Sequence, residues 1–261
     1  GGALVYDNVV KVRDLLGEIS FDTALNLDPL RQVKDADEIA LIRCACRIAD
    51  EGFAHILSYI QPGMTELEVA AELEHSMRMH GSERPAFQTI IASGARGSLP
   101  HGAASDKVIA RGDLVTMDFG AVCGGYHSDI TRTICVGHAD ARQRDVYNAV
   151  LAAQQRALAA LRPGVTGIEV DRIARDVLAE YDLEQYFGHG LGHSLGLEIH
   201  EEPRLSKAGK NMMQPNMLIT DEPGVYIPGW GGIRIEDTVL ITADGAEPLT
   251  RASKEFIEIC T

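Results

Sequence analysis

The chain has 261 residues, of which 45% are hydrophobic and 24% are charged, a composition typical of a globular protein with a sizeable core. Its 38 acidic and 24 basic residues give a formal charge of -14, which disfavours nucleic acid as a partner, because phosphate binding needs a basic surface. No apolar stretch approaches the roughly 20 residues that cross a bilayer, and no leader pattern opens the chain, so we expect no membrane partner. The five cysteines include no C-x-x-C pair and predict reduced, mostly buried thiols in a cytoplasmic protein.

The first strongly predicted element is a helix that begins after Asp35. Glu38 completes a capping box with Asp35, and apolar residues then recur every three or four positions until Pro62-Gly63. An internal repeat follows, because residues 62–69 recur as residues 163–170 with the same Thr-x-x-Glu helix start. Such a phrase is common at helix starts, but acidic positions further along recur in the same order, which favours a duplicated half-domain.

Two halves that each place helices before strands predict an α+β domain with an antiparallel sheet. A two-residue turn at Gly124-Gly125 sets the register of the first strand pair, in which opposed residue numbers sum to 249. Asp118 then faces Thr131. One face of this pair carries apolar residues that must pack on helices, and the other carries mainly threonines, glycines and acids.

Asp118 and Asp129 are diagonal neighbours on the polar face. Two solvated acids would be the ordinary interpretation of such a pair. Threonines and glycines flank both acids, however, and no Lys or Arg shares their face. Because two close carboxylates repel each other unless a cation neutralises them, the pair indicates a hard divalent metal ion.

A glycine-rich segment, residues 188–196, carries His189 and His193, and His200 follows it. The glycine density argues against a helix and indicates backbone packed closely around a site. One histidine alone would most often be structural, but three so close together favour metal binding or catalysis. His101 occupies a tight loop upstream of Asp118, and the role of His127, on the acid-bearing face, stays open.

Two further acids, Glu222 and Glu236, each interrupt an apolar strand, where an unpaired charge would be costly. They correspond in the repeat to Asp118 and Asp129, displaced by 104 and 107 residues. Four carboxylates with one imidazole suit a two-metal site better than a closed zinc site.

These residues resemble the pita-bread metallopeptidases of family M24, which include methionine aminopeptidase, Xaa-Pro aminopeptidase and prolidase. The resemblance extends from about residue 31 to residue 255 and implies a pita-bread fold with duplicated half-domains and a curved antiparallel sheet with helices on its outer face. His189 and the phrase Gly-Ile-Arg-Ile-Glu-Asp at 232–237 are similar to the proline-specific branch. Asp221 departs from the family pattern, which usually has an apolar residue there.

The resemblance also implies roles for individual residues. It assigns two divalent ions, with manganese expected and cobalt, zinc or iron as alternatives, to Asp118, Asp129, His193, Glu222 and Glu236. Glu222 would also accept a proton, His101 and His200 would hold the scissile carbonyl oxygen and the departing imide nitrogen, and His189 would shape the proline pocket. Arg234 would orient Glu236 or His200, or bind the carboxylate of a short substrate.

We therefore expect a hydrolase that cleaves the bond between an N-terminal residue and a following proline, as an Xaa-Pro aminopeptidase or dipeptidase. The alternatives are a methionine aminopeptidase and a non-catalytic pita-bread binding module. The expected partners are a proline-containing peptide or dipeptide and a second copy in a homodimer. Residues 1–34 are expected to be the remnant of, or linker from, a further N-terminal domain, and residues 35–261 the catalytic domain.

Overall fold

The computed structural model describes residues 6–16 and 28–260, and the chain divides into two compact units, residues 1–31 and 32–261. Part of the expected N-terminal remnant or linker therefore lies outside the described residues. The first unit contains helix α1 (Tyr6–Leu16) and most of the short helix α2 (Asp28–Gln32). The architecture below is that of the second unit.

The first half of this unit begins with two helices, α3 (Ala36–Tyr59) and α4 (Glu66–Met79). The predicted capping box of Asp35 and Glu38 is present at the start of α3. A mostly antiparallel sheet follows in the order β1-β2-β5-β13, with only β13 parallel to its neighbour. Its strands, the β3–β4 hairpin beside it and a 3-10 helix are β1 (Ile90–Ser93), η1 (Gly94–Ser98), β2 (Asp113–Phe119), β3 (Val122–Cys123), β4 (Tyr126–His127), β5 (Ile130–Val136) and β13 (Glu258–Ile259).

The predicted strand register is confirmed. Asp118 pairs with Thr131, and all pairs from Asp113–Val136 to Cys123–Tyr126 have numbers that sum to 249. Gly124 and Gly125 both have positive φ, 58° and 81°, as the tight turn between β3 and β4 requires.

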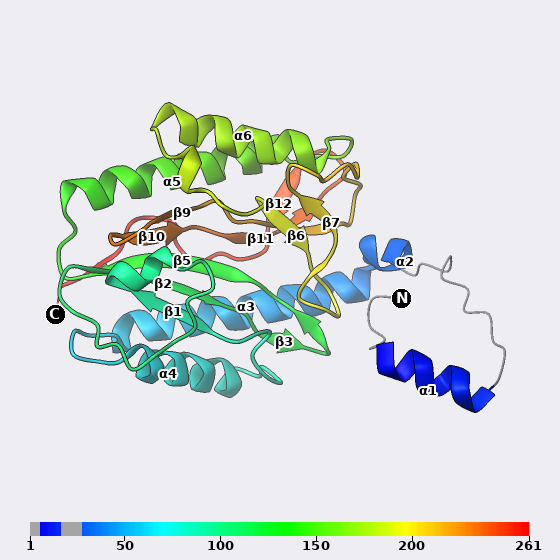
Figure 1. The fold of residues 1–261 in the computed structure, drawn as a ribbon, viewed down its shortest axis with the longest axis horizontal. Helices are drawn as coiled ribbons and strands as arrows, with labels where there is room; N and C mark the ends of the chain where they lie inside the picture. The colour runs from blue at the N-terminus through cyan, green and yellow to red at the C-terminus, as the bar shows by residue number, and fades with distance from the viewer. Residues whose placement is uncertain (1–5, 17–27, 261) are drawn as a thin grey trace. The chain divides into compact units, whose positions relative to one another are not determined.

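The second half repeats the plan with helices α5 (Ala141–Ala160) and α6 (Gly167–Glu180) followed by short antiparallel strands. Helix α6 begins with the same capping box as α4, formed by Thr166 and Glu169, as the sequence repeat predicted. In Figure 1, α3 and α4 lie on one side of the strands and α5 and α6 on the other. The remaining elements are η2 (Glu184–Tyr186), β6 (Gly192–Ser194), β7 (Glu201–Leu205), β8 (Leu218–Asp221), β9 (Gly224–Ile227), β10 (Gly231–Arg234), β11 (Asp237–Ile241) and β12 (Ala246–Pro248).

The core lies between the helices and the strands of each half. The apolar face of β2 and β5 packs on α3 and α4, as predicted, with Phe119 stacked on Phe53. A second cluster joins α5 and α6 to the strands of the second half, and a smaller one joins α3 to β8 and β11. The polar face of β2 and β5 contacts β10 through Thr133, whose hydroxyl bonds both the N–H and the carbonyl of Arg234. The candidate site residues of the two halves meet on this face.

Two expectations change at this stage. The prediction that all cysteines are reduced is wrong, because Cys44 of α3 and Cys123 of β3 form a disulfide with their Cα atoms 6.2 Å apart. Cys46 and Cys135 are buried free thiols, and Cys260 is an exposed one. Glu222 and Glu236, expected within strands, instead lie directly after β8 and between β10 and β11. In the described part of the chain, every helix is too short or too polar to cross a membrane.

Candidate metal centre and active site

Three carboxylates converge at the junction of the two halves. One oxygen each from Asp118, Asp129 and Glu236 lies within 4.8 Å of the others. Asp118 is near the end of β2 and Asp129 immediately precedes β5, so the observed register makes them diagonal neighbours. The backbone N–H of Glu236 donates to the Thr131 carbonyl over 3.1 Å, and this contact brings the second half to the first.

His193 and Glu222 complete the group. His193 Nε2 lies 3.6 Å from Asp129 Oδ2 and 3.4 Å from Glu222 Oε1. Thr220 links the two elements, because its hydroxyl accepts from the His193 N–H and donates to Glu222 Oε1. Gly192 permits this approach, since a Cβ at that position would collide with the Thr220 carbonyl. The five residues predicted as metal ligands are thus brought together.

Burial makes this group unfavourable without a cation. Desolvation raises the pKa of Asp118, raises those of Asp129 and Glu236 well above the usual carboxyl range, and raises that of Glu222 to about 7. Mutual repulsion adds to the shifts of Asp129 and Glu236. Burial, followed by the neighbouring His200, lowers the pKa of His193 to about 3, so its imidazole is neutral and able to bind a metal.

The donor set fits divalent metal ions. Asp118 Oδ1 and Asp129 Oδ1 are buried and have no hydrogen-bond partner among the described residues. Such acceptor atoms would be costly in a folded protein unless a cation contacts them. Four carboxylates and one neutral imidazole offer the oxygen-rich ligand set that hard and borderline divalent ions prefer.

Arg234 lies beside the cluster and holds it in place. Its guanidinium donates to Asp118 Oδ2 at 2.5 Å and to Thr131 Oγ1 at 2.9 Å. Thr131 in turn donates to Glu236 Oε2 at 2.5 Å, so Arg234 orients Glu236 through that hydroxyl and Asp118 directly. The direct contact with Asp118 was not predicted.

Tyr226 was missed by the sequence analysis. Its hydroxyl lies 2.6 Å from Arg234 Nη1 and 2.9 Å from His189 Nε2, and so joins these two predicted residues. His189 also packs edge-on against Phe187. Burial and then the charge of Arg234 lower the pKa of His189 to about 4, so this imidazole is neutral at pH 7. The position of Tyr226 four residues after Glu222 offered little signal, because a tyrosine in a strand is ordinary.

A cavity of about 520 Å³ opens over the carboxylates. His101 and His200, both exposed, line it from different loops, and the His200 ring lies 4.4 Å from that of His193. Apolar side chains, among them Phe87 and Ile199, form part of its wall. His127, left open by the sequence, is buried elsewhere: its Nδ1 lies 3.0 Å from the Gly196 carbonyl and its Nε2 3.3 Å from Arg84, which indicates a structural role.

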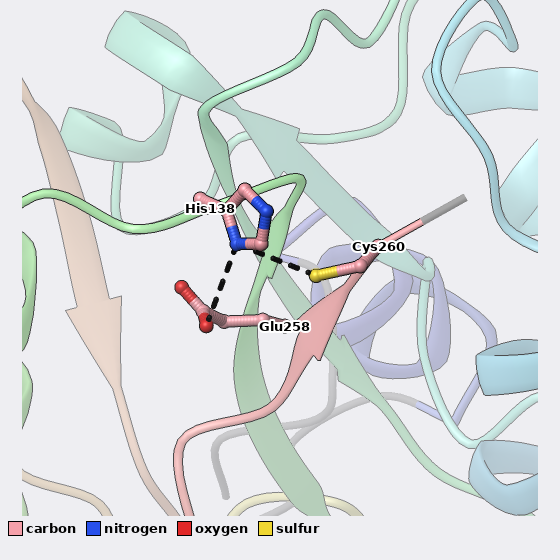
Figure 2. Close-up of side chains that lie close together, drawn as sticks. All are labelled: His138, Glu258 and Cys260. Atoms are coloured by element: carbon pink, nitrogen blue, oxygen red, sulfur yellow. Dashed lines mark hydrogen bonds and ion pairs between the residues drawn. The ribbon is translucent and has the colours of Figure 1, made fainter.

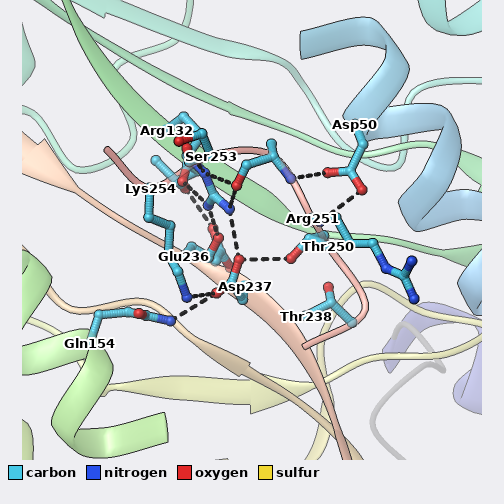
Figure 3. A network of polar contacts seen from close by, with 12 residues as sticks. Asp50, Arg132, Gln154, Glu236, Asp237, Thr238, Thr250, Arg251, Ser253 and Lys254 are labelled. Carbon is cyan, nitrogen blue, oxygen red and sulfur yellow. Dashed lines mark hydrogen bonds and ion pairs between the residues drawn. The ribbon is translucent and has the colours of Figure 1, made fainter. Parts of the chain in front are cut away.

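A buried polar network adjoins the cluster at Glu236 (Figure 3). Arg132 donates to the backbone carbonyls of Thr131 and Glu236 and to Asp237 Oδ1 at 2.8 Å. Asp237 also accepts from Gln154, Thr250 and Lys254 (Figure 3). The network therefore fixes the backbone that carries Glu236 and ties it to α5 and to the segment after β12.

Asp221 is buried next to this network. It pairs across the strands with Asp237, and neither of its carboxylate oxygens has a hydrogen-bond partner among the described residues. Burial, followed by the charge of Asp237, raises the pKa of Asp221 well above the usual carboxyl range. The departure seen in the sequence therefore places a buried carboxyl directly beside Glu222.

Comparison with known proteins gives a consistent result. The sequence profile of metallopeptidase family M24 matches residues 40–243. A Xaa-Pro dipeptidase of Pyrococcus furiosus is 53% identical over 87% of this chain and 66% of its own length. The chain thus spans just under two thirds of the length of the curated relatives it matches, 66% and 65% for two of them.

Two solved structures extend the likeness to three dimensions. A Xaa-Pro dipeptidase from Bacillus anthracis has a TM-score of 0.95 and 45% identity, covering 98% of this chain and 72% of the other. An X-Pro aminopeptidase from Thermotoga maritima has a TM-score of 0.94 and 40% identity, with coverage of 98% and 72%. The expected α+β pita-bread fold is confirmed by this likeness.

Proposed function

The chain belongs to metallopeptidase family M24, and from this membership we propose that it is a metal-dependent exopeptidase that hydrolyses the bond between an N-terminal residue and a following proline. The relatives named Xaa-Pro dipeptidase and X-Pro aminopeptidase support the proline specificity. Neither alternative, a methionine aminopeptidase or a non-catalytic binding module, gains support from these comparisons. We assign the activity to residues 35–261.

The observation that carries the proposal is the convergence of four carboxylates and one neutral imidazole beneath a cavity. We propose that two divalent ions, with manganese as the expected metal, bind Asp118, Asp129, His193, Glu222 and Glu236. The orphaned Oδ1 atoms of Asp118 and Asp129 support this assignment. When bound, such ions lower the pKa of a water molecule and polarise the scissile carbonyl.

The side chains around the cluster then have separate roles. Glu222 accepts the proton of the attacking water, because a carboxylate that binds a metal ion through one oxygen keeps a second oxygen for the proton. His101 and His200 contact the carbonyl oxygen and the departing imide nitrogen as charge develops there. His189 contributes to the proline pocket beside Tyr226.

The two arginines of the cavity differ in their freedom to bind substrate. Arg234 already donates to Asp118, Thr131, Tyr226 and the Pro100 carbonyl, so we assign it to positioning rather than to substrate binding. Arg204 is 48% exposed, and its charged partner is Glu202, at 3.3 Å. We propose that Arg204 pairs with the carboxylate of a dipeptide substrate.

Two further proposals concern the setting of the enzyme. We propose a homodimer, which sedimentation would test. We also propose a cytoplasmic setting, a prediction that depended on reduced cysteines. Thiol trapping in cell extract tests it by showing whether Cys44 and Cys123 are oxidised.

The function is tested with three peptides, Ala-Pro, Ala-Pro-Ala and Met-Gly-Ala, after chelation and after return of Mn²⁺ or Co²⁺. We expect metal-dependent cleavage before proline and none of Met-Gly-Ala. Cleavage of the dipeptide alone indicates a dipeptidase, and cleavage of the tripeptide indicates an aminopeptidase. Cleavage of Met-Gly-Ala alone, or none in metal-loaded protein, contradicts the proposal.

A further inference from the structure

A second group of metal-binding side chains lies outside the active site. His138, Glu258 and Cys260 gather beside the end of β5, with one potential ligand atom each within 4.8 Å of the others. Figure 2 shows the imidazole above the carboxylate and the thiol. We call this group the His138–Glu258–Cys260 cluster, and no step of the proposed reaction uses it.

The strand pairing explains why these residues meet. Strand β13 runs parallel to β5, with Glu258 beside Cys135 and Ile259 beside Val136. Because side chains alternate along a strand, Glu258 and Cys260 project to the same side. His138 follows the end of β5 after Gly137, whose positive φ of 99° turns the chain there. Two separate segments therefore present three donors to one point.

The spacing of the donor atoms is close to that of a tetrahedral zinc site. A zinc ion bound to a nitrogen at about 2.0 Å and a sulfur at about 2.3 Å sets these atoms about 3.5 Å apart. His138 Nδ1 and Cys260 Sγ are separated by 3.5 Å. His138 Nδ1 and Glu258 Oε2 are 3.9 Å apart, against about 3.3 Å in such a site, so the exposed imidazole would have to move by about half an ångström.

The carboxylate of Glu258 is already held in a suitable orientation. Its Oε1 accepts from the Ala139 N–H at 2.5 Å and from Arg144 Nη2 at 2.7 Å. These two donors leave Oε2 directed toward His138 (Figure 2). Metal-binding carboxylates are held in this way when outer hydrogen-bond partners fix one oxygen and leave the other to bind the ion.

We propose that the His138–Glu258–Cys260 cluster binds one Zn²⁺ ion, with water as the fourth ligand. Sulfur, nitrogen and oxygen donors together favour borderline-soft ions such as Zn²⁺ over Mn²⁺, which prefers oxygen. The seven residues of β5 separate Asp129 from the cluster, about 23 Å at the rise of an extended strand, so the site is separate from the catalytic carboxylates.

The test uses the full chain, titrated with Co²⁺ alone in the absence of oxygen and of reductant, so that Cys260 stays a thiol and the Cys44–Cys123 disulfide stays intact. A thiolate bound to Co²⁺ gives a near-ultraviolet charge-transfer absorption that carboxylate and imidazole ligands do not give, so this band reports the cluster and not the catalytic centre. The variants are Cys260→Ser and His138→Asn, with His75→Asn as the matched control, because His75 is an exposed helix residue. Peptidase activity is measured in parallel.

We expect a saturable band that Zn²⁺ removes by displacing Co²⁺. Cys260→Ser should abolish it, His138→Asn should weaken Co²⁺ binding at least about tenfold, and His75→Asn should leave it unchanged. Peptidase activity with Mn²⁺ should be equal in all four proteins. The Co²⁺ band is read without any peptidase assay, so failure of the proposed function would not affect this test. Absence of the band in the unmodified chain would overturn the proposal. Unchanged Co²⁺ affinity in His138→Asn would also overturn it, because Cys260 would then bind the ion without the cluster.

Discussion

Asp237 offers the sharpest test of how the carboxylate cluster is supported. Its Oδ1 accepts from Arg132 and Thr250, and its Oδ2 accepts from Gln154 and Lys254 (Figure 3). Burial alone would raise the pKa of Asp237, but Arg132 and Lys254 lower it below its ordinary value. Asp237→Asn keeps the shape of the side chain, removes its charge and turns an N–H₂ group toward two donors.

The size of the effect follows from burial. The side chains of Arg132 and Asp237 are 2% and 1% exposed, so the variant leaves a buried cation without its anion. Removing one partner of a buried ion pair costs about 3–5 kcal/mol. At about 2–4 °C per kcal/mol for a chain of this length, the melting temperature should fall by roughly 6–20 °C.

The assay is thermal unfolding of the metal-free protein at pH 7, with Asp244→Asn as the control. Asp244 is exposed, and its contact with Thr242 is a weak one of 3.3 Å, so that variant should change stability by no more than about 0.5 kcal/mol. Equal melting temperatures for the two variants would refute the argument that this network stabilises the backbone of Glu236.

Four other predictions follow from the site. Glu222→Gln should lower kcat about 10²–10⁴-fold if this residue accepts the proton, and a wild-type kcat in metal-loaded Glu222→Gln would exclude that role. Tyr226→Phe removes hydrogen bonds to Arg234 and His189 and should cost about 1.5–3 kcal/mol of transition-state stabilisation, measured as kcat/KM, whereas Tyr59→Phe at the surface should have none of this effect. Arg204→Met should raise KM for Ala-Pro about tenfold and for Ala-Pro-Ala less, and equal changes would argue against pairing with a dipeptide carboxylate. The pKa of Glu222 in the metal-free protein is raised to about 7, so its carboxyl holds a proton at pH 6 that a bound metal ion displaces. Mn²⁺ binding should therefore release more protons at pH 6 than at pH 8.5, as measured by calorimetry in two buffers. Equal release at the two pH values would contradict the raised pKa.

The local structure was largely predictable from the sequence. The capping boxes at Asp35, Thr65 and Thr166 follow from side chains within four residues of each other. The Gly124-Gly125 turn fixed the register of β2 and β5, and with it the approach of Asp118 to Asp129. Short-range rules suffice for these features because the interacting groups are close in the chain.

The contacts between the two halves were not predictable in this way. Arg234 contacts Asp118 across 116 residues, and Cys44 bonds Cys123 across 79, with no spacing that would indicate either pair. Glu222 and Glu236 were assigned to the site because each was expected to interrupt an apolar strand, and because the repeat and the family resemblance agreed. Their position at strand ends depends on how the halves pack, which periodicity does not report.

The central claim is that metal bound by the carboxylate cluster drives hydrolysis before proline. The most direct measurement is titration of the metal-free chain with Mn²⁺ while Ala-Pro and Ala-Pro-Ala hydrolysis and the amount of bound metal are followed together. We predict no hydrolysis without metal and activity that saturates as two ions per chain bind. Hydrolysis that survives complete removal of metal, or two bound ions with no hydrolysis of either peptide, would contradict the account.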